Sequence, residues 1–432
     1  RAAQAILQYG VGAMVDFPDQ TLMTAAPEYW GGKDDFRLIR DERLERQLDV
    51  DYLALPRDKS DRYREKGVAY TRFPQWYFCP KCRRLAPLTE WYGDYKAYWR
   101  KVNKDLLQED PYMKRPSCLG EKCRGAKGKG IGLVPARIVV ACEAGHIDDF
   151  PWVEWVHATA HKKVCNVPKL VFKTGVNSTA GLEGLTVSCE NEGCKASATL
   201  EHAFDKNGLA NRIDGYHCSG NMPWTNRHVH CGCIPQSKQR GASVVYYPKV
   251  DSSLVIPPYS DKLRNRIISS AEFMDYKSKI RDNDEYETGT RTEFINRRFD
   301  KWLAELSSAI NADPQIVRPI LTTLLSDEGT ETEILEASSE LYRQAEYHAL
   351  NGTTPQSKDD DFEREEISGS RYGIPGVVQV ALLHKIREVR AHIGFTRLDP
   401  PTTGNLGVPS QDLGRFQCVK RPETRWYVAK KR

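Results

Sequence analysis

The chain has 432 residues, of which 40% are hydrophobic and 28% are charged, and its net charge at pH 7 is +5. This length favours two or three domains over a single core, and the composition excludes the disordered and membrane classes. No apolar run approaches the roughly 18 to 20 residues of a membrane helix, and the first residues lack the layout of a signal peptide, so we expect a cytoplasmic protein without membrane contact.

The segment 1–132 is predicted as an N-terminal region that carries a metal-binding module. Its opening part, up to about residue 75, is rich in glycine and proline and is expected to be loop-rich. From Thr71 to Gly132 the sequence is dominated by cysteine, aromatic and basic residues with little periodicity. A bound metal ion would organise a segment that otherwise lacks a core.

Two short cysteine pairs lie in this module. Cys79 and Cys82 are separated by two residues, and Cys118 and Cys123 by four. Four thiolates complete the tetrahedral shell of a structural Zn²⁺, and close pairs in a cytosolic chain favour metal over disulfides. We therefore predict a zinc site formed by these four cysteines, with a hairpin or helix inserted between the pairs.

The region 133–258 is predicted as mixed α/β. The run PARIVVAC has the β-branched character of a buried strand, and GASVVYYPKVDSSLVIP offers two strands separated by a turn. A second zinc module is expected in the same region.

The second zinc module is less regular than the first. Cys189 and Cys194 form its short pair, Cys218 supplies a third ligand, and the fourth is either Cys231 or Cys233, with Cys231 favoured. Imidazole is an equally good zinc ligand. Three nearby histidines could therefore substitute in this site: His217, His228 and His230.

A third constellation contains Cys142, His146 and Asp148. A cysteine, a histidine and a carboxylate can act as nucleophile, base and orienting group. The alternative is structural, with the first two residues fixing a turn above a core filled by Trp152 and Trp155. Two further cysteines, Cys165 and Cys418, have no evident partner and are predicted to be buried thiols.

The C-terminal part changes in character. The region 259–350 is predicted to be helical, because apolar residues recur at spacings of three and four in Ile295, Phe299, Trp302, Leu303, Leu306 and Ile310. The stretch 351–370 is expected to be a linker or mobile loop, and 371–432 a C-terminal region with an apolar run passing into a basic helix or strand. The fold class expected is α+β: multi-domain and loop-rich, with two zinc-ribbon-like modules and a mainly helical segment.

The distribution of charge and the lack of a complete phosphate-binding loop in the sequence limit the functions expected for the chain. From Lys101 to Gly130 there are eight basic residues against four acidic ones, whereas Asp327 to Glu366 has an acidic excess. Two glycine spacings resemble a phosphate-binding loop, but Ala126 and Ile131 stand where the motif requires lysine. We therefore expect no ATP hydrolysis by this chain.

Several separated motifs follow one another in a distinctive order. They are RAAQAILQYGVGAMVDF, CPKC, CEAGHIDDFPWVEWVH, CENEGC, CSGNMPW, QRGASVVYYPKVDSSLVIP and REVRAHIGFTRLDPP. In this arrangement, which spans nearly the whole chain, the sequence resembles the DrmB family, the zinc-containing, helicase-associated subunits of the bacterial anti-phage system DISARM.

The resemblance implies a non-enzymatic accessory subunit that binds a DrmA-like helicase ATPase and helps it engage DNA. It implies structural Zn²⁺, ATPase activity in the partner and no small-molecule substrate. Phosphate contacts would then come from the basic cluster, through Lys114, Arg115, Lys122, Arg124, Lys127 and Lys129. Two alternatives stay open: a thiol- or metal-dependent enzyme acting at Cys142, His146 and Asp148, and an architectural subunit without DNA contact.

Overall fold

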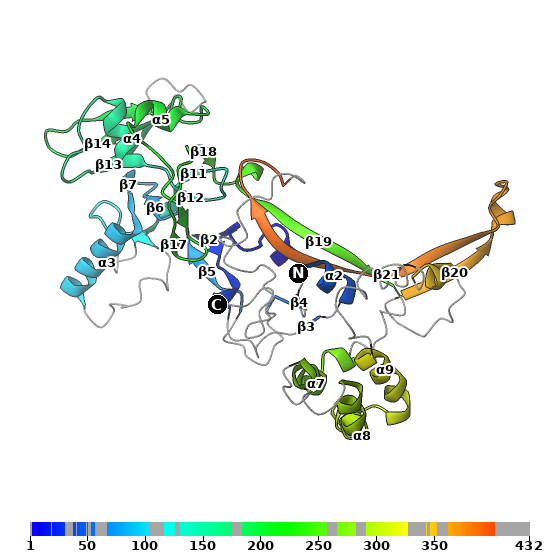
Figure 1. Cartoon of the computed structure of the whole chain (residues 1–432). Helices are drawn as coiled ribbons and strands as arrows, with labels where there is room; N and C mark the ends of the chain where they lie inside the picture. Colours follow the sequence, from blue (N-terminus) through cyan, green and yellow to red (C-terminus); the bar gives the residue numbers. More distant parts are fainter. Residues whose placement is uncertain are drawn as a thin grey trace.

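The structure is a computed structural model that combines several small antiparallel sheets with helices, which confirms the predicted α+β class (Figure 1). None of the helices in the described ranges combines the length and apolar character that a membrane crossing requires. The residues that the structure describes are 2–18, 20–30, 38–39, 41–48, 50, 53–56, 67–103, 116–125, 130–174, 184–256, 266–281, 291–326, 343, 346–351 and 362–401.

A three-stranded antiparallel sheet lies near the N-terminus. Its order is β1-β2-β5, and helix α1 and the 3-10 turn η1 flank it. Its core also receives Trp224 and Phe395, whose rings meet edge to face at 5.1 Å, so distant parts of the chain close this core together. The elements are α1 (Ala2–Ile6), β1 (Met14–Phe17), β2 (Gln20–Thr24), η1 (Pro27–Tyr29) and β5 (Tyr70–Arg72).

Two short elements, the β3-β4 pair and helix α2, lie between β2 and β5 in the sequence. Leu44 of α2 and Leu53 of β4 pack with Val255, Val389 and Ala391, so this segment covers part of the β19-β21 ribbon described below. The elements are β3 (Leu38–Ile39), α2 (Glu42–Leu48) and β4 (Leu53–Ala54).

The largest sheet has six antiparallel strands in the order β10-β6-β7-β13-β14-β15. Helix α4 packs against its β14-β15 end, and Trp152 and Trp155 of that helix are almost fully buried in the sheet's core. Helix α3 follows β7 and contacts the small β8-β9 pair. The elements are β6 (Trp76–Phe78), β7 (Arg84–Pro87), α3 (Leu88–Val102), β8 (Ser117–Cys118), β9 (Ile131–Gly132), β10 (Val134–Pro135), α4 (Trp152–Thr159), β13 (Leu170–Thr174), β14 (Leu185–Cys189), β15 (Ser197–Thr199) and α5 (Gly208–Arg212).

A third sheet has the order β12-β11-β18 and confirms the buried strand expected in PARIVVAC, since all four residues of β11 are buried. The hairpin β16-β17 contacts β12. The elements are β11 (Ile138–Ala141), β12 (Ile147–Asp149), β16 (Asn221–Met222), β17 (Arg227–His228) and β18 (Gln236–Gln239).

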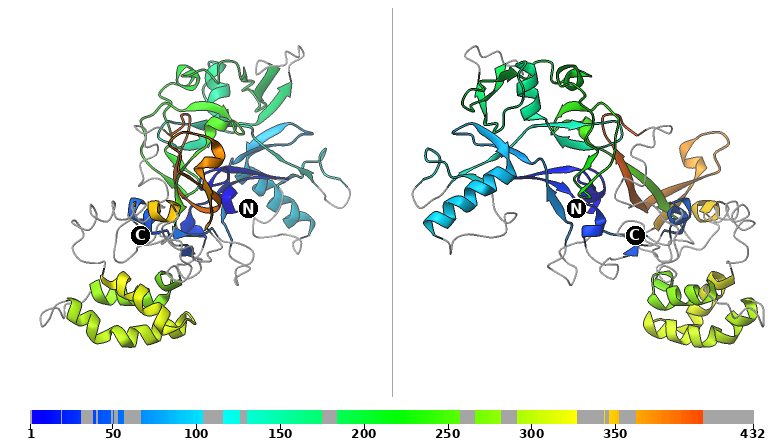
Figure 2. Two further views of the ribbon diagram at one scale, coloured as in Figure 1. Left: turned by 90° about the vertical axis from the view of Figure 1, so that its right-hand side faces the viewer. Right: turned by 60° about the vertical axis from the view of Figure 1, so that its left-hand side comes forward.

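Three helices form a core of their own. The predicted helical face is confirmed, because Trp302, Leu303 and Leu306 are buried on α8 and pack with residues of α7 and α9. In both views of Figure 2 these helices lie apart from the sheets. The elements are α7 (Ala271–Arg281), α8 (Arg291–Ala309) and α9 (Pro314–Ser326).

A long ribbon crosses the middle of the molecule (Figure 1). Strand β21 (Gln379–Thr396) pairs through its second half with β19 (Tyr247–Val255) and through its first half with β20 (Phe362–Ser368). The β20-β21 hairpin, closed by η8 (Gly369–Tyr372), forms an arm with many exposed residues on both strands.

Two expectations for this part of the chain are wrong. The segment GASVVYYPKVDSSLVIP forms the 3-10 turn η6 (Ser243–Val245) followed by one nine-residue strand, not two strands. The described end of the expected linker is the strand β20, because its residues pair with the start of β21.

Candidate metal centres

Three groups of four side chains bring potential ligand atoms within 4.8 Å of one another, and each group could hold a metal ion. We name each group by its first cysteine in the chain. The Cys79 group contains Cys79, Cys82, Cys118 and Cys123; the Cys142 group contains Cys142, His146, Cys218 and Cys231; and the Cys165 group contains Cys165, His157, Cys189 and Cys194.

The Cys79 group matches the first predicted quartet residue for residue. Cys79 and Cys82 lie in the turn between β6 and β7, where Arg83 adopts the left-handed conformation with φ 66° and its N–H donates to the Cys79 carbonyl at 2.9 Å. Cys118 is in β8 and Cys123 in the turn after it. Two turns from different hairpins therefore face each other.

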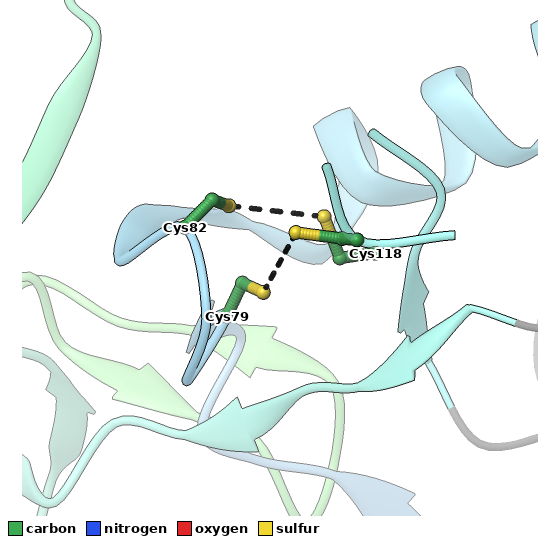
Figure 3. Close-up of side chains that lie close together, drawn as sticks. Cys79, Cys82 and Cys118 are labelled. Carbon is green, nitrogen blue, oxygen red and sulfur yellow. Dashed lines mark hydrogen bonds between the residues drawn. The ribbon is translucent and has the colours of Figure 1, made fainter. Parts of the chain in front are cut away.

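The sulfur positions in the Cys79 group suit a tetrahedral ion (Figure 3). Sγ of Cys79 lies 3.7 Å from Sγ of Cys123, and Sγ of Cys82 lies 3.8 Å from Sγ of Cys118. Sulfurs held at about 2.3 Å from a tetrahedral zinc are about 3.8 Å apart. The same spacing is too long for a disulfide, whose S–S bond is about 2.0 Å.

The protein environment favours the thiolate form of one member of this group. Burial opposes ionisation of Cys79, but hydrogen bonds from the backbone N–H groups of Cys82 and Lys81 lower the pKa of its thiol. Burial raises the pKa of Cys118, and neighbouring thiols add to the effect. A bound cation would offset the repulsion between neighbouring thiolates, because a thiol that coordinates a metal ion is deprotonated.

The second predicted quartet is not brought together. The structure divides it, placing Cys189 and Cys194 in the Cys165 group and Cys218 and Cys231 in the Cys142 group. Cys233 is outside both groups, although its carbonyl accepts a hydrogen bond from the N–H of Cys218 at 3.0 Å.

The histidines expected as substitutes, His217, His228 and His230, are exposed and belong to none of the groups. The histidines that do belong are His146 and His157, which are 3% and 0% exposed.

The Cys142 group joins a tight turn to the flanks of a hairpin. Cys142 directly follows β11, and Gly145, with φ 84°, turns the chain back so that Nδ1 of His146 lies 3.4 Å from Sγ of Cys142. Cys218 precedes β16 and Cys231 follows β17. A hydrogen bond with Cys218, together with burial, raises the pKa of Cys142 to about 12.

The Cys165 group joins helix α4 to the turn between β14 and β15. His157 is in the last turn of α4, and its Nε2 lies 3.2 Å from Sγ of Cys194. Sγ of Cys165 lies 3.7 Å from Sγ of Cys189. Burial opposes ionisation of Cys165, but a hydrogen bond with His157 and others lower its pKa to about 7.

The zinc sites predicted from the sequence did not include four members of these groups: Cys142, His146, His157 and Cys165. A signal existed for the first two, because a cysteine and a histidine four positions apart around a glycine form a turn. None existed for the other two. Their partners come from β14 and the turn that follows it, and the packing of α4 on the β14-β15 end of the sheet brings them together.

The carboxylate of Asp148 is hydrogen-bonded to residues outside the predicted catalytic constellation. Asp148 accepts hydrogen bonds from Ser219 at 2.6 Å and Asn221 at 3.1 Å, while His146 faces the sulfur of Cys142. The thiol itself is 0% exposed. These residues therefore fit a metal group better than a nucleophile, base and orienting carboxylate.

The predicted basic residues are only partly described. Lys122 and Arg124 are exposed in and after the Cys118–Cys123 turn, and the guanidinium of Arg124 lies over the ring of Tyr98 on α3, 5.5 Å from its centre. The other four lie outside the described residues: Lys114, Arg115, Lys127 and Lys129.

The chain is similar in sequence to a curated protein and to a domain family. DISARM protein DrmB of Bacillus paralicheniformis is 27% identical over 394 residues, which are 90% of this chain and 61% of that protein. This likeness confirms the resemblance found in the motifs, and the chain spans about three-fifths of the length of this relative. A domain family of unknown function, DUF8724, matches residues 1–247, more than half of the 432 residues. The chain therefore belongs to the DUF8724 family.

Proposed function

We propose that this chain is an accessory subunit of a DISARM-type antiviral complex, in which it binds a helicase-like ATPase and helps that partner engage DNA. The relationship to DrmB over 90% of the chain supports a place in such a complex. The observation that carries the DNA role is the contact between Arg124 and Tyr98, which joins the basic turn of the Cys79 group to helix α3.

The surface around this contact combines positive charge with aromatic rings. The last turn of helix α3 contains the exposed residues Arg100 and Lys101, and Trp99 packs edge to face against Tyr98 at 5.1 Å. Basic side chains bind phosphates by releasing counterions, and aromatic faces stack on unpaired bases. This surface therefore suits a nucleic-acid strand.

The Cys79 group would hold the surface in shape. We propose that its four thiolates bind Zn²⁺, because the paired sulfur distances of 3.7 and 3.8 Å fit a closed tetrahedral site. Trp91 of α3 packs in the same core as the group and donates from Nε1 to the carbonyls of Tyr77 in β6 and Ala86 in β7, which fixes the helix to the two strands that flank the Cys79–Cys82 turn.

The β20-β21 arm is the surface best suited to the ATPase. Exposed apolar residues lie at its tip (Tyr372, Ile374 and Val378) and midway along the part of β21 that pairs with β20 (Leu382 and Leu383). Val378 is 86% exposed. Apolar patches of this kind on a soluble chain mark protein contacts, and the projecting shape would let the arm reach a partner (Figure 1).

Charge reversal tests the DNA role in the intact pair of chain and ATPase. Lys122→Glu with Arg124→Glu should weaken DNA binding at least tenfold at low salt and should flatten the salt dependence by about two phosphate contacts. A matched control is Lys206→Glu with Arg212→Glu, because both residues are exposed and lie near α5.

Two outcomes of this experiment separate the alternatives. Loss of affinity in the first variant but not in the control supports the proposal. Equal affinity of both variants and the unchanged pair would show that the basic surface contacts only protein, as expected for an architectural subunit.

A further inference from the structure

We propose that the Cys142 and Cys165 groups each bind their own zinc ion, so that the chain carries three ions rather than two. Each new centre would have three thiolates and one imidazole in place of the single four-cysteine site that the sequence suggested. The ligand sets are complete on the described residues, because each offers four atoms within 4.8 Å. Tetrahedral structural zinc needs four.

His157 is oriented as a metal ligand. Its Nδ1 lies 2.7 Å from the carbonyl oxygen of Val153, which can only accept, so Nδ1 carries the proton. Nε2 then has a free lone pair, and this atom is the one that faces the sulfur of Cys194 at 3.2 Å. A histidine that ligates a metal through one nitrogen commonly donates the other N–H to such a backbone oxygen.

The three cysteines of the Cys165 group would complete the coordination shell of the zinc ion bound by His157. Sγ of Cys165 and Sγ of Cys189 are 3.7 Å apart, which equals the spacing in the Cys79 group and the separation expected around tetrahedral zinc. Cys194 is positioned by a turn in which Gly193 has φ 82° and Lys195 has φ 47°. The turn thus has the tight left-handed geometry seen at Arg83.

In the Cys142 group a backbone N–H group is placed to stabilise a thiolate. The N–H of Gly220 points at Sγ of Cys218 at 3.3 Å, and a backbone donor of this kind stabilises a charged sulfur. Glycine is required at this position, since φ is 66° and a Cβ would lie 1.6 Å from the carbonyl oxygen of Val229. The hairpin that carries Cys218 and Cys231 is therefore closed tightly enough to hold two ligands.

A buried cation beside the Cys142 group provides an independent argument. Arg397 is 1% exposed, and its guanidinium donates to the carbonyls of Gly145 at 2.8 Å, Val245 at 2.5 Å and Gly12 at 2.9 Å. These acceptors are neutral, and the rings of Trp224 and Phe395, whose centres lie 5.3 and 4.7 Å from the guanidinium, add cation–π attraction but no negative charge. An unbalanced buried charge is costly.

A zinc ion bound by the Cys142 group would give this group a negative charge that balances the positive charge of Arg397. One Zn²⁺ with three thiolates and a neutral imidazole has a net charge of −1, whereas three neutral thiols have none. The centre and the arginine would therefore form a compensated pair that joins strand β21 to the β11-β12 turn.

The experiment is a metal count on the full chain, expressed with zinc, dialysed exhaustively and measured by elemental analysis and native mass spectrometry. Three zinc ions per chain are expected. Cys165→Ser and Cys231→Ser should each remove a different ion, and the double variant should remove two. Cys233→Ser is the matched control and should retain all three, because the side chain of Cys233 contacts Cys231 but lies outside the ligand set.

X-ray absorption on the unsubstituted protein gives a readout that does not depend on a variant folding. The three sites together contain two histidine nitrogens, so the averaged zinc shell should be mainly sulfur with a clear nitrogen contribution. A count of two ions with an all-sulfur shell would overturn the proposal. It would also fail if Cys165→Ser left the count unchanged.

Discussion

Nε of Arg397 donates a hydrogen bond to the carbonyl oxygen of Gly145 at 2.8 Å, although the two residues are 252 positions apart. Gly145 lies in the turn between Cys142 and His146, and Arg397 directly follows β21. The end of the long ribbon is therefore fastened to the turn that carries half of the Cys142 group.

Replacing this arginine should cost more stability than replacing an exposed one. In Arg397→Lys the charge is kept, but a single ammonium cannot reach three carbonyls on separate segments, and each buried group left unpaired costs about 1–3 kcal/mol. We expect the free energy of unfolding to fall by about 3 kcal/mol in denaturant titrations. Arg390→Lys, at an exposed position of β21, is the control, and equal values for the two variants would contradict the account.

Asp149 should make stability depend on pH. Burial raises its pKa to about 7, even though it accepts hydrogen bonds from the N–H groups of Gln75 and Trp76. Between the unfolded pKa of about 4 and pH 7 the folded state holds a proton that the unfolded state has lost, so this carboxyl group lowers stability as pH rises through that window.

Asp149→Asn removes that titration while keeping an oxygen that can accept both N–H groups. The variant should therefore gain stability relative to the unchanged protein as pH rises from about 4 to about 7, by an amount on the order of 4 kcal/mol. Thermal or denaturant unfolding at several pH values would measure the difference. A constant difference across the window would show that Asp149 has an ordinary pKa in the folded chain.

The hairpin around Cys218 should depend on Gly220. In Gly220→Ala the new Cβ would meet the carbonyl of Val229 at 1.6 Å in a conformation with φ 66° that alanine disfavours. We expect a loss of at least about 2 kcal/mol in unfolding free energy, because the left-handed conformation alone costs about 1–2 kcal/mol. Gly241→Ala, where a Cβ meets nothing within 4 Å, should change little. If both substitutions are tolerated equally, the hairpin is not held as tightly as described.

The tip of the arm should matter for the ATPase and not for folding. Ile374→Ser with Val378→Ser removes two apolar side chains that are 57% and 86% exposed, so stability should change by less than about 0.5 kcal/mol. Co-purification with the ATPase should fall at least tenfold. Leu254→Ser on β19 is the control, since this residue is 47% exposed but lies outside the arm. Undiminished co-purification of the arm variant would place the interface elsewhere.

Local patterns in the sequence were sufficient to predict part of the fold and one of the three candidate metal groups. The Cys79 group could be predicted because each of its two turns contains a pair of ligands close in sequence, and α8 because its apolar residues follow the helical period. The arm could not be predicted from such patterns. The first half of β21 is exposed on both faces, so its sequence lacks the alternation of apolar and polar residues typical of a half-buried strand.

The division of the second quartet could not be predicted for a different reason. Cys194 finds its partner His157 across 37 positions, through the packing of α4 on the β14-β15 end of the sheet, and sequence spacing contains no record of that contact. Cysteines near in sequence were therefore assigned to one site when the fold places them in two.

The most direct measurement of the proposed function is DNA binding by the ATPase with and without this chain, across several salt concentrations. The account predicts that the pair binds more tightly than the ATPase alone and that its affinity falls more steeply with salt, because this chain adds phosphate contacts. Identical affinities and identical salt slopes for the pair and the ATPase alone would contradict a role for this chain in engaging DNA.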